Sequence, residues 1–352
     1  MKTASCGTHM LENPSVETTL LCGLVLAGGE GQRLRSLVTR LRGDALPKQY
    51  VNFSGSRSMI EHTYRRAERL IPRERLFTIV NRAHLNFPEV NHQLRDRHRG
   101  TVIVQPTNLE TGSGLLLALM YIRKRYPNAI VAVFPSDQFV LETDRLMRHI
   151  QLAYAIVERR PFSLVLLGMT PDYEEQDYGY IVPETGTDSS GWGIRNVQTF
   201  IEKPNRLRAS ELIRQGALWN TMLFVFNIAT LLAWVHEVEA EFYGHFGRIY
   251  DAIGTRREAR LIHATYSNQL RAVNFSTGLL EPIAERYPGR LAVLPVTDVT
   301  WSDWGTERRI VSTLKNIGRL PCHVTLVPAL DRPSRRRTPK PFGPDRRAVY
   351  TL

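Results

Sequence analysis

The chain has 352 residues, of which 43% are apolar and 23% are charged. This composition supplies enough apolar side chains for one large domain or two smaller ones, and it excludes an intrinsically disordered protein. No apolar run approaches the roughly 18 residues that a membrane-spanning helix needs, so an integral membrane protein is also excluded. The formal net charge is +12, and its meaning depends on where the charges lie.

Much of the positive charge lies near the end of the chain. Residues 331–347 contain six Arg and one Lys against two Asp, a local net charge of +5. We expect residues 319–352 to form a C-terminal extension with a basic, disordered and solvated tail; binding of an anionic partner by this tail is the alternative. Residues 1–17 have no periodicity and should form a flexible leader. Residues 18–318 then form the folded domain.

The three cysteines, Cys6, Cys22 and Cys322, are widely spaced along the chain. They form no CxxC pair and no cysteine–histidine cluster with the spacing of zinc ligands, so neither a structural zinc site nor a disulfide framework is indicated. Such sparse cysteine usage is typical of a reducing compartment, and we expect a cytoplasmic protein.

The first half of the chain alternates short apolar runs with longer amphipathic segments. This alternation predicts crossover connections and a mainly parallel sheet with helices on both faces, an α/β doubly wound, Rossmann-like fold. In chain order the expected elements are the strand Cys22–Leu26, the helix Ser58–Leu70, the strands Leu76–Val80 and Val102–Gln105, the helix Thr111–Arg125, the strand Ile130–Phe134, the helix Thr143–Glu158 and the strand Ser163–Leu167.

Beyond Pro171 the apolar runs follow one another at shorter intervals. This change predicts that the sheet continues into a β-rich lobe that faces the substrate. The expected strands are Tyr178–Val182, Gly193–Ile201, Leu218–Phe226, Leu291–Val296 and a short edge segment, Cys322–Val327, and the expected helices are Ala209–Gln215, Ile228–Val238 and Thr306–Asn316.

The strongest local signal is the glycine-rich turn G-G-E-G-Q-R-L, which runs from Gly28 to Leu34 directly after the first strand. Glycines let backbone N–H groups approach phosphate oxygens, and the following helix N-terminus favours negative charge. The turn matches neither a P-loop nor the dinucleotide fingerprint, which needs a third glycine at Leu34. Arg33 and Lys48, the latter in a P-K-Q motif, add two cations that suit a triphosphate. A tight turn with surface cations is the alternative.

Two acidic residues lie in separate motifs that could share a metal ion. Asp137 ends the motif F-P-S-D after an expected strand, and Asp303 lies in W-S-D-W-G before the last helix. Ligands of open α/β sheets bind beyond the carboxyl ends of the strands. Mg²⁺ is usually held by one or two carboxylates together with substrate phosphates, so the pair is a candidate magnesium site. A lone aspartate at a strand end is as often a turn former.

These motifs, in this order, resemble those of the sugar-1-phosphate nucleotidyltransferases, in particular the bacterial mannose-1-phosphate guanylyltransferases. The resemblance extends from about Leu20 to Gly305. It implies transfer of NMP from an NTP, with GTP favoured, to a sugar 1-phosphate, with mannose 1-phosphate favoured. It also implies a Mg²⁺ cofactor on Asp137 and Asp303. The partners are then small-molecule substrates and a possible homodimer, with no membrane partner, and nucleic acid is disfavoured because no aromatic residues interleave the basic ones.

The resemblance also implies the role of individual residues. Arg33, Lys48 and Asp137 would be catalytic. The E-K-P motif would supply Glu202 and Lys203 to the sugar phosphate, and the W-N-T motif would supply Asn220; by themselves these are typical of surface and turn positions. The nucleotide-binding set would be Leu26, Ala27, Gly28, Gly29, Gly31, Arg33, Lys48, Gln105, Asn108, Thr111 and Gly112.

Several positions depart from the guanylyltransferase pattern, mostly on the side of the sugar. Another sugar phosphate or another NTP therefore stays open, as does a nucleotide-sugar-binding regulator without activity. The departures are Gln32 for Thr, Gln138 for His, Met222 and Leu223 for Gly-Met, Asn274-Phe275-Ser276 where many members have Asp, and Pro282 for Lys.

Overall fold

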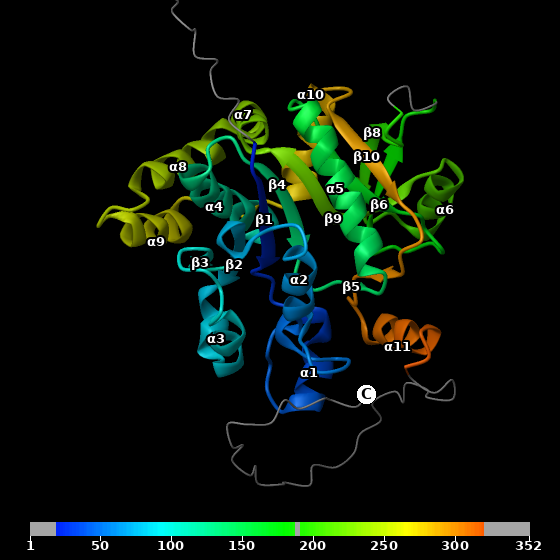
Figure 1. The fold of residues 1–352 in the computed structure, drawn as a ribbon, viewed down its shortest axis with the longest axis horizontal. Helices are drawn as coiled ribbons and strands as arrows, with labels where there is room; N and C mark the ends of the chain where they lie inside the picture. Colours follow the sequence, from blue (N-terminus) through cyan, green and yellow to red (C-terminus); the bar gives the residue numbers. More distant parts are fainter. Residues whose placement is uncertain (1–18, 187–190, 320–352) are drawn as a thin grey trace, which may run out of the picture.

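The computed structural model describes residues 19–186 and 191–319. These residues form a nine-stranded mixed sheet between two layers of helices, and a separate two-stranded ribbon (Figure 1). The expected leader 1–17 and the expected strand and basic tail beyond residue 319 lie outside the described residues. Among the described residues, no helix is long and apolar enough to cross a membrane.

Four strands form the parallel half of the sheet, in the order β3-β2-β1-β4. Their carboxyl ends meet at one edge, so the loops that follow β1, β3 and β4 lie close together there. The strands are β1 (Leu21–Ala27), β2 (Leu76–Asn81), β3 (Val102–Gln105) and β4 (Ile130–Pro135).

The other half of the sheet is largely antiparallel, so the prediction of a mainly parallel sheet is wrong there. The strand β9 runs antiparallel to both β4 and β6, β7 and β8 pair antiparallel, and β6 and β10 are parallel. Only 11 residues, 184–194, separate β7 from β8, too few for a helical crossover. Because β7 also pairs with β9, the five strands close on themselves. They are β6 (Leu164–Met169), β7 (Gly179–Pro183), β8 (Arg195–Glu202), β9 (Leu218–Asn227) and β10 (Leu291–Val296).

Helices cover both faces of the sheet because its side chains alternate between two cores. Val25 and Ala27 point into one core, and Cys22 and Leu24 point into the other. The first core is covered by α1 (Arg35–Arg42), α2 (Met59–Ala67), α3 (Pro88–Leu94), α5 (Thr143–Arg159), α6 (Arg206–Arg214) and α11 (Glu307–Asn316). The second is covered by α4 (Glu110–Arg125), α7 (Ile228–Val238), α8 (Ala240–Ala252), α9 (Glu258–Asn268) and α10 (Glu281–Arg286).

The strands and helices predicted within the described residues are confirmed, most within one or two residues of their bounds. The helices α3, α8, α9 and α10 were not predicted. In α8 the residues Gly244 and Gly247 lower the helix propensity, so the sequence pattern does not predict a helix there. In α10 Pro282 lies in the first turn, where proline is tolerated, although it also resembles a helix breaker.

A two-stranded ribbon brings the loop that follows β4 together with the segment that follows β10. The strand β5 (Phe139–Val140) pairs antiparallel with β11 (Trp301–Ser302). Behind the ribbon the buried ring of Trp304 stacks on Phe139, with 4.8 Å between ring centres. The ribbon therefore holds the W-S-D-W-G segment beside the loop that follows β4.

The packing of three strands around Gly168 offers a test of this topology. A Cβ at Gly168 in β6 would lie 2.7 Å from Cβ of Leu218 and 3.0 Å from Val293, on the two neighbouring strands. Gly168→Ala should therefore lower the free energy of unfolding by about 1–3 kcal/mol. Gly244→Ala in α8, where a Cβ meets nothing within 4 Å, should raise it by up to about 1 kcal/mol. Urea unfolding of both variants measures the difference, and an equal effect would contradict the strand order.

Candidate active site

The glycine turn is fixed by the side chain of Gln49. Its amide nitrogen donates to the carbonyl of Ala27 at 3.0 Å and to the carbonyl of Gly29 at 2.8 Å. Gly31 has φ of 62°, a left-handed conformation that favours glycine, and begins the short 3-10 turn Gln32–Leu34. The turn is thus held open toward solvent with its backbone close to the end of β1.

The ammonium group of Lys48 connects three motifs that are distant in the sequence. It donates to the carbonyl oxygens of Asp303 at 3.0 Å and Trp304 at 3.3 Å, and it pairs with Oδ2 of Asp137 at 3.0 Å. The residue is buried, and a Cβ on Gly31 would lie 3.1 Å from its backbone nitrogen. Lys48 therefore joins the glycine turn, the F-P-S-D motif and the W-S-D motif.

A cavity of about 340 Å³ opens beside the glycine turn. One acceptor in its wall is unsatisfied: Oε1 of the buried Gln105 has no hydrogen-bond partner in the described part of the chain. The absence of side chains at Gly28 and Gly114 makes room for this amide, since a Cβ there would lie 2.5 Å and 2.9 Å from it. The predicted residues that line the cavity are Leu26, Gly28, Gly29, Gly31, Gln105, Asn108, Thr111 and Asp137.

Gly112, which was predicted to bind the nucleotide, makes a packing contact. Its N–H donates to the carbonyl of Val273 at 2.8 Å, and a Cβ would lie 2.6 Å from the same oxygen. The residue thus sets how closely α4 approaches the segment before α10. Its predicted contact with nucleotide stays a prediction.

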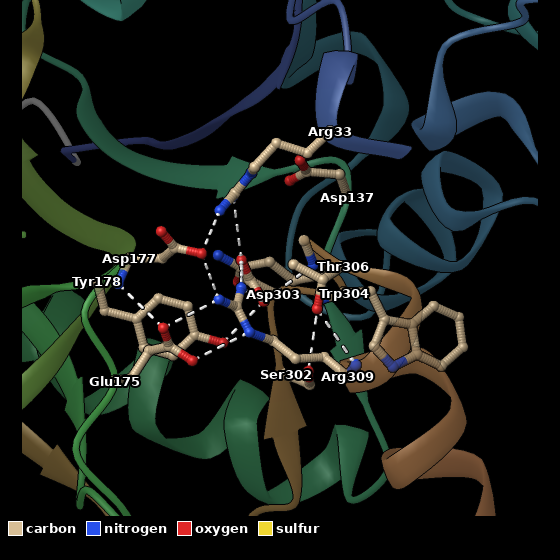
Figure 2. Close-up of polar contacts among 12 residues, drawn as sticks. Arg33, Asp137, Glu175, Asp177, Tyr178, Ser302, Asp303, Trp304, Thr306 and Arg309 are labelled. Carbon is tan, nitrogen blue, oxygen red and sulfur yellow. Dashed lines mark hydrogen bonds and ion pairs between the residues drawn. The ribbon is translucent and has the colours of Figure 1, made fainter. Parts of the chain in front are cut away.

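The carboxylate of Asp303 is surrounded by donors (Figure 2). Its oxygens accept from the Tyr178 hydroxyl at 2.7 Å, the Gly305 N–H at 3.0 Å, and Nη1 of Arg309 at 2.9 and 2.8 Å. Burial alone would raise the pKa of Asp303, but Lys48 and Arg309 outweigh it and hold the pKa below its usual range. Asp303 therefore stays ionised at neutral pH.

The predicted phosphate ligand Arg33 lies at the edge of this cluster. Its Nη1 donates to Oδ2 of Asp177 at 2.8 Å, and its Nη2 lies 3.5 Å from Oδ2 of Asp303. The side chains of Arg33 and Asp177 are 52% and 44% exposed, so water screens their pair and it contributes at most about 1 kcal/mol. The guanidinium can therefore leave these carboxylates at little cost.

The predicted sugar-phosphate residues lie on the strands of the closed ring. Glu202 ends β8 and pairs with its neighbour Lys203 at 3.7 Å, and Lys203 has φ of 47° and is 60% exposed. Burial raises the pKa of Glu202, and Lys203 opposes this only in part. In β9, Asn220 accepts from the N–H of Met222 at 3.0 Å, and Met222 lines the cavity. None of the three lines the cavity; Asn220 contacts it through Met222, and Glu202 lies opposite Gly179 of β7.

The proposed magnesium ligands differ in how well they suit a metal ion. Asp137 fits, because it lines the cavity and its side chain is 36% exposed. One of its carboxylate oxygens pairs with Lys48, and the carboxylate is not enclosed by donors as that of Asp303 is. Asp303 does not fit as arranged, because both of its oxygens accept from Arg309. Within residues 19–186 and 191–319 there is no group of three or more His, Cys, Asp or Glu placed to hold a metal.

Sequence reasoning missed the charged residues that complete the site. Glu175 and Asp177 belong to an acidic loop between β6 and β7, and Arg309 follows the W-S-D-W-G motif. The signals were present, since the loop has three acids within four residues, Glu174 to Asp177, next to an expected strand. Their partners are far away in the sequence, so the charge pattern by itself indicates a solvated surface.

The family model for nucleotidyl transferases matches residues 22–317 of this chain. The match covers the glycine turn, both aspartate motifs and every described strand except the first residue of β1. The chain therefore belongs to the nucleotidyl transferase family, and the resemblance noted in its motifs to sugar-1-phosphate nucleotidyltransferases is confirmed.

Individual relatives extend this assignment. The chain is 28% identical over 218 residues to a mannose-1-phosphate guanylyltransferase of Escherichia coli, a match that covers 60% of this chain and 45% of that protein. It is 27% identical over 225 residues to the alginate biosynthesis protein AlgA of Pseudomonas fluorescens, covering 62% and 44%. The chain thus matches less than half the length of these relatives.

A solved structure gives the same picture of the fold. The structure of an enzyme from Thermus thermophilus, described as mannose-1-phosphate geranyltransferase, superposes with a TM-score of 0.67 and is 26% identical. The superposition covers 83% of this chain and 79% of that one. The α/β nucleotidyltransferase fold therefore extends over most of the described residues.

The position of Asp137 between Lys48 and the cavity leads to a direct prediction. Asp137→Asn should lower turnover by at least about a hundredfold, the size of effect seen when one electrostatic group of an active site is removed. Asp251→Asn, the same change at an exposed position on α8, should leave turnover unchanged. Pyrophosphate release at saturating Mg²⁺, with melting temperatures as the folding control, measures both. Near-native turnover of Asp137→Asn would contradict its assignment.

Proposed function

We propose that the protein transfers a nucleoside monophosphate from GTP to mannose 1-phosphate, with release of pyrophosphate. The observation that carries this proposal is the convergence of the glycine turn, Lys48 and Asp137 around one cavity in a chain of the nucleotidyl transferase family. The choice of substrates is supported by the mannose-1-phosphate guanylyltransferase of Escherichia coli. A cytoplasmic location and a homodimer stay predictions from the sequence.

The free acceptor of Gln105 supports a purine with donors on its pairing edge. Guanine presents adjacent N1–H and N2–H groups, and a buried acceptor without a partner costs free energy until such a donor reaches it. With the base against Gln105 and Asn108, the triphosphate would extend along the glycine turn toward Lys48 and Arg33. Arg33 would exchange Asp177 for a phosphate oxygen.

The sugar phosphate would bind at the ends of β8 and β9. Lys203 is exposed enough to meet an incoming phosphate, and the partly buried Glu202 and Asn220 offer groups that can orient sugar hydroxyls. The two substrates would then lie on opposite sides of Met222, which belongs to the cavity wall and contacts Asn220.

The chemistry needs no covalent enzyme intermediate, because the sugar phosphate already carries an anionic oxygen that can attack the α-phosphorus. The protein then contributes orientation and compensation of charge. Lys48 and Arg33 would compensate the charge of the departing pyrophosphate. We propose that Mg²⁺, held by Asp137 and the phosphates of the substrate, supplies further neutralisation of charge.

A panel of substrates tests the proposed function. GTP, ATP, UTP, CTP and dTTP are each combined with the 1-phosphates of mannose, glucose, galactose and a heptose, and pyrophosphate release is measured. We expect the highest kcat/KM for GTP with mannose 1-phosphate. If a different pair has the highest kcat/KM, the proposed reaction stands and the proposed substrates are replaced. Binding of nucleotide sugar without turnover of any pair would instead identify a regulator.

The two phosphate-binding cations should have separable effects. A charge-assisted contact to phosphate is worth roughly 1.5–3 kcal/mol, or about ten- to a hundredfold in affinity. Lys203→Ala should weaken binding of the sugar phosphate by this factor and leave the NTP nearly unaffected, and Arg33→Ala should do the reverse. Isothermal titration with each substrate measures both. Loss of NTP binding in Lys203→Ala, with normal sugar-phosphate affinity, would mean that the two sides are reversed.

A further inference from the structure

Arg309 is the most completely paired cation of the site, and no role in the reaction has been given to it. Its Nε donates to Glu175 at 3.1 Å, its Nη2 to Asp177 at 2.7 Å, and its Nη1 to both oxygens of Asp303. The side chain is 9% exposed and lies over the ring of Tyr178, with 4.8 Å from Cζ to the ring centre (Figure 2).

The backbone at Gly305 and at the start of α11 leaves room for the contact between Arg309 and Asp303. Arg309 lies in the first turn of α11, where its N–H donates to Oγ1 of the capping residue Thr306 at 3.3 Å. At Gly305 a Cβ would lie 2.3 Å from Oδ2 of Asp303, 2.7 Å from Nη2 of Arg33 and 2.8 Å from Nη1 of Arg309. Glycine at this position therefore leaves the space in which the two guanidinium groups meet the carboxylate.

The two arginines share the same oxygen atoms. Oδ2 of Asp177 accepts from Arg309 at 2.7 Å and from Arg33 at 2.8 Å, and Oδ2 of Asp303 lies 2.8 Å from Arg309 and 3.5 Å from Arg33. Arg309 is buried, whereas Arg33 is half exposed. When Arg33 leaves, both oxygens keep a charged partner, and no buried carboxylate is left uncompensated.

We propose that Arg309 is a positioning residue that keeps Arg33 available for the triphosphate of the substrate. By satisfying Asp177 and Asp303, Arg309 prevents these carboxylates from holding Arg33 against the protein. The inference rests on the proposed function in that Arg33 is taken to bind the NTP. The proposed role also explains why Asp303 does not fit a metal ion as arranged, because both of its carboxylate oxygens accept hydrogen bonds from Arg309.

Binding of an NTP analogue in the presence of Mg²⁺ tests the proposal without relying on turnover. The probe is α,β-methylene GTP, or the same analogue of whichever NTP the substrate panel selects, titrated by calorimetry. Arg309→Gln should weaken binding by about fivefold, the upper value for an exposed ion pair that Arg33 now has to break. Arg309→Lys, which keeps the charge, should recover part of the affinity.

The acidic loop supplies a matched pair of second-site variants. Asp177 contacts both arginines, whereas Glu175 contacts Arg309 and, among the described residues, makes no ion pair with Arg33. Asp177→Asn in the Arg309→Gln background should restore affinity to within about twofold of the native protein, and Glu175→Gln should not. In the native background Arg309 already satisfies Asp177, so Asp177→Asn should leave the affinity for the analogue within about twofold of the native value, less than one exposed ion pair can contribute.

The outcomes separate this proposal from a purely structural role and from the proposed function. Native affinity of Arg309→Gln, or equal rescue by Glu175→Gln, would overturn the proposal. If Arg309→Gln does not fold, the single variant Asp177→Asn decides: a several-fold gain in affinity would show that Asp177 still holds Arg33 in the native protein and would overturn the proposal. Binding of the analogue with no pyrophosphate release from any substrate pair would refute the proposed reaction and leave the role of Arg309 supported.

Discussion

The ion pair and hydrogen bonds of the Lys48 ammonium group hold the site together. A lysine this buried is tolerated only when its charge is compensated, and Lys48 meets this condition with Asp137 and two backbone carbonyls. Because one carbonyl belongs to Asp303 and the backbone of Lys48 lies against Gly31, three separate loops are fixed relative to one another. The cavity, the exposed Arg33 and the cluster around Arg309 all depend on that arrangement.

The parallel and antiparallel halves of the sheet carry different parts of the candidate site. The parallel strands β1, β3 and β4 end at the cavity, which is where loops of a parallel sheet gather. The antiparallel strand β9 crosses from the parallel half into the closed ring and carries Asn220 and Met222 with it. Glu202 reaches the same region because β8 pairs with β7 at Gly179, where a Cβ would lie 2.7 Å from its carboxylate. One strand therefore links the proposed nucleotide side to the proposed sugar side.

Local patterns predicted the parts of the structure that local physics determines. The glycine turn, the strand ends at Gln105 and Asp137, and most element bounds follow from periodicity and turn chemistry, and the structure places them as expected. The antiparallel half was missed because strand direction depends on loop length and on the neighbours that a strand finds. The partners of Arg309 were missed because Asp177 is 132 residues away, and only the fold brings the two charges together.

The pKa values of Asp303 and Glu202 shift in opposite directions, although burial alone would raise both. At Asp303 the cations Lys48 and Arg309 outweigh burial and lower the pKa, so its ionised form stabilises the fold above the usual pKa, and this is lost only as the pH falls through the lowered value. At Glu202 burial outweighs Lys203 and raises the pKa, so ionisation costs stability as the pH rises. Asp303 therefore stays ionised near neutrality, whereas Glu202 takes up a proton at a higher pH than an ordinary glutamate does. Under the proposed function, the site would thus keep its fixed cations where the triphosphate is proposed to bind, and would have its adjustable charge beside the proposed position of the sugar.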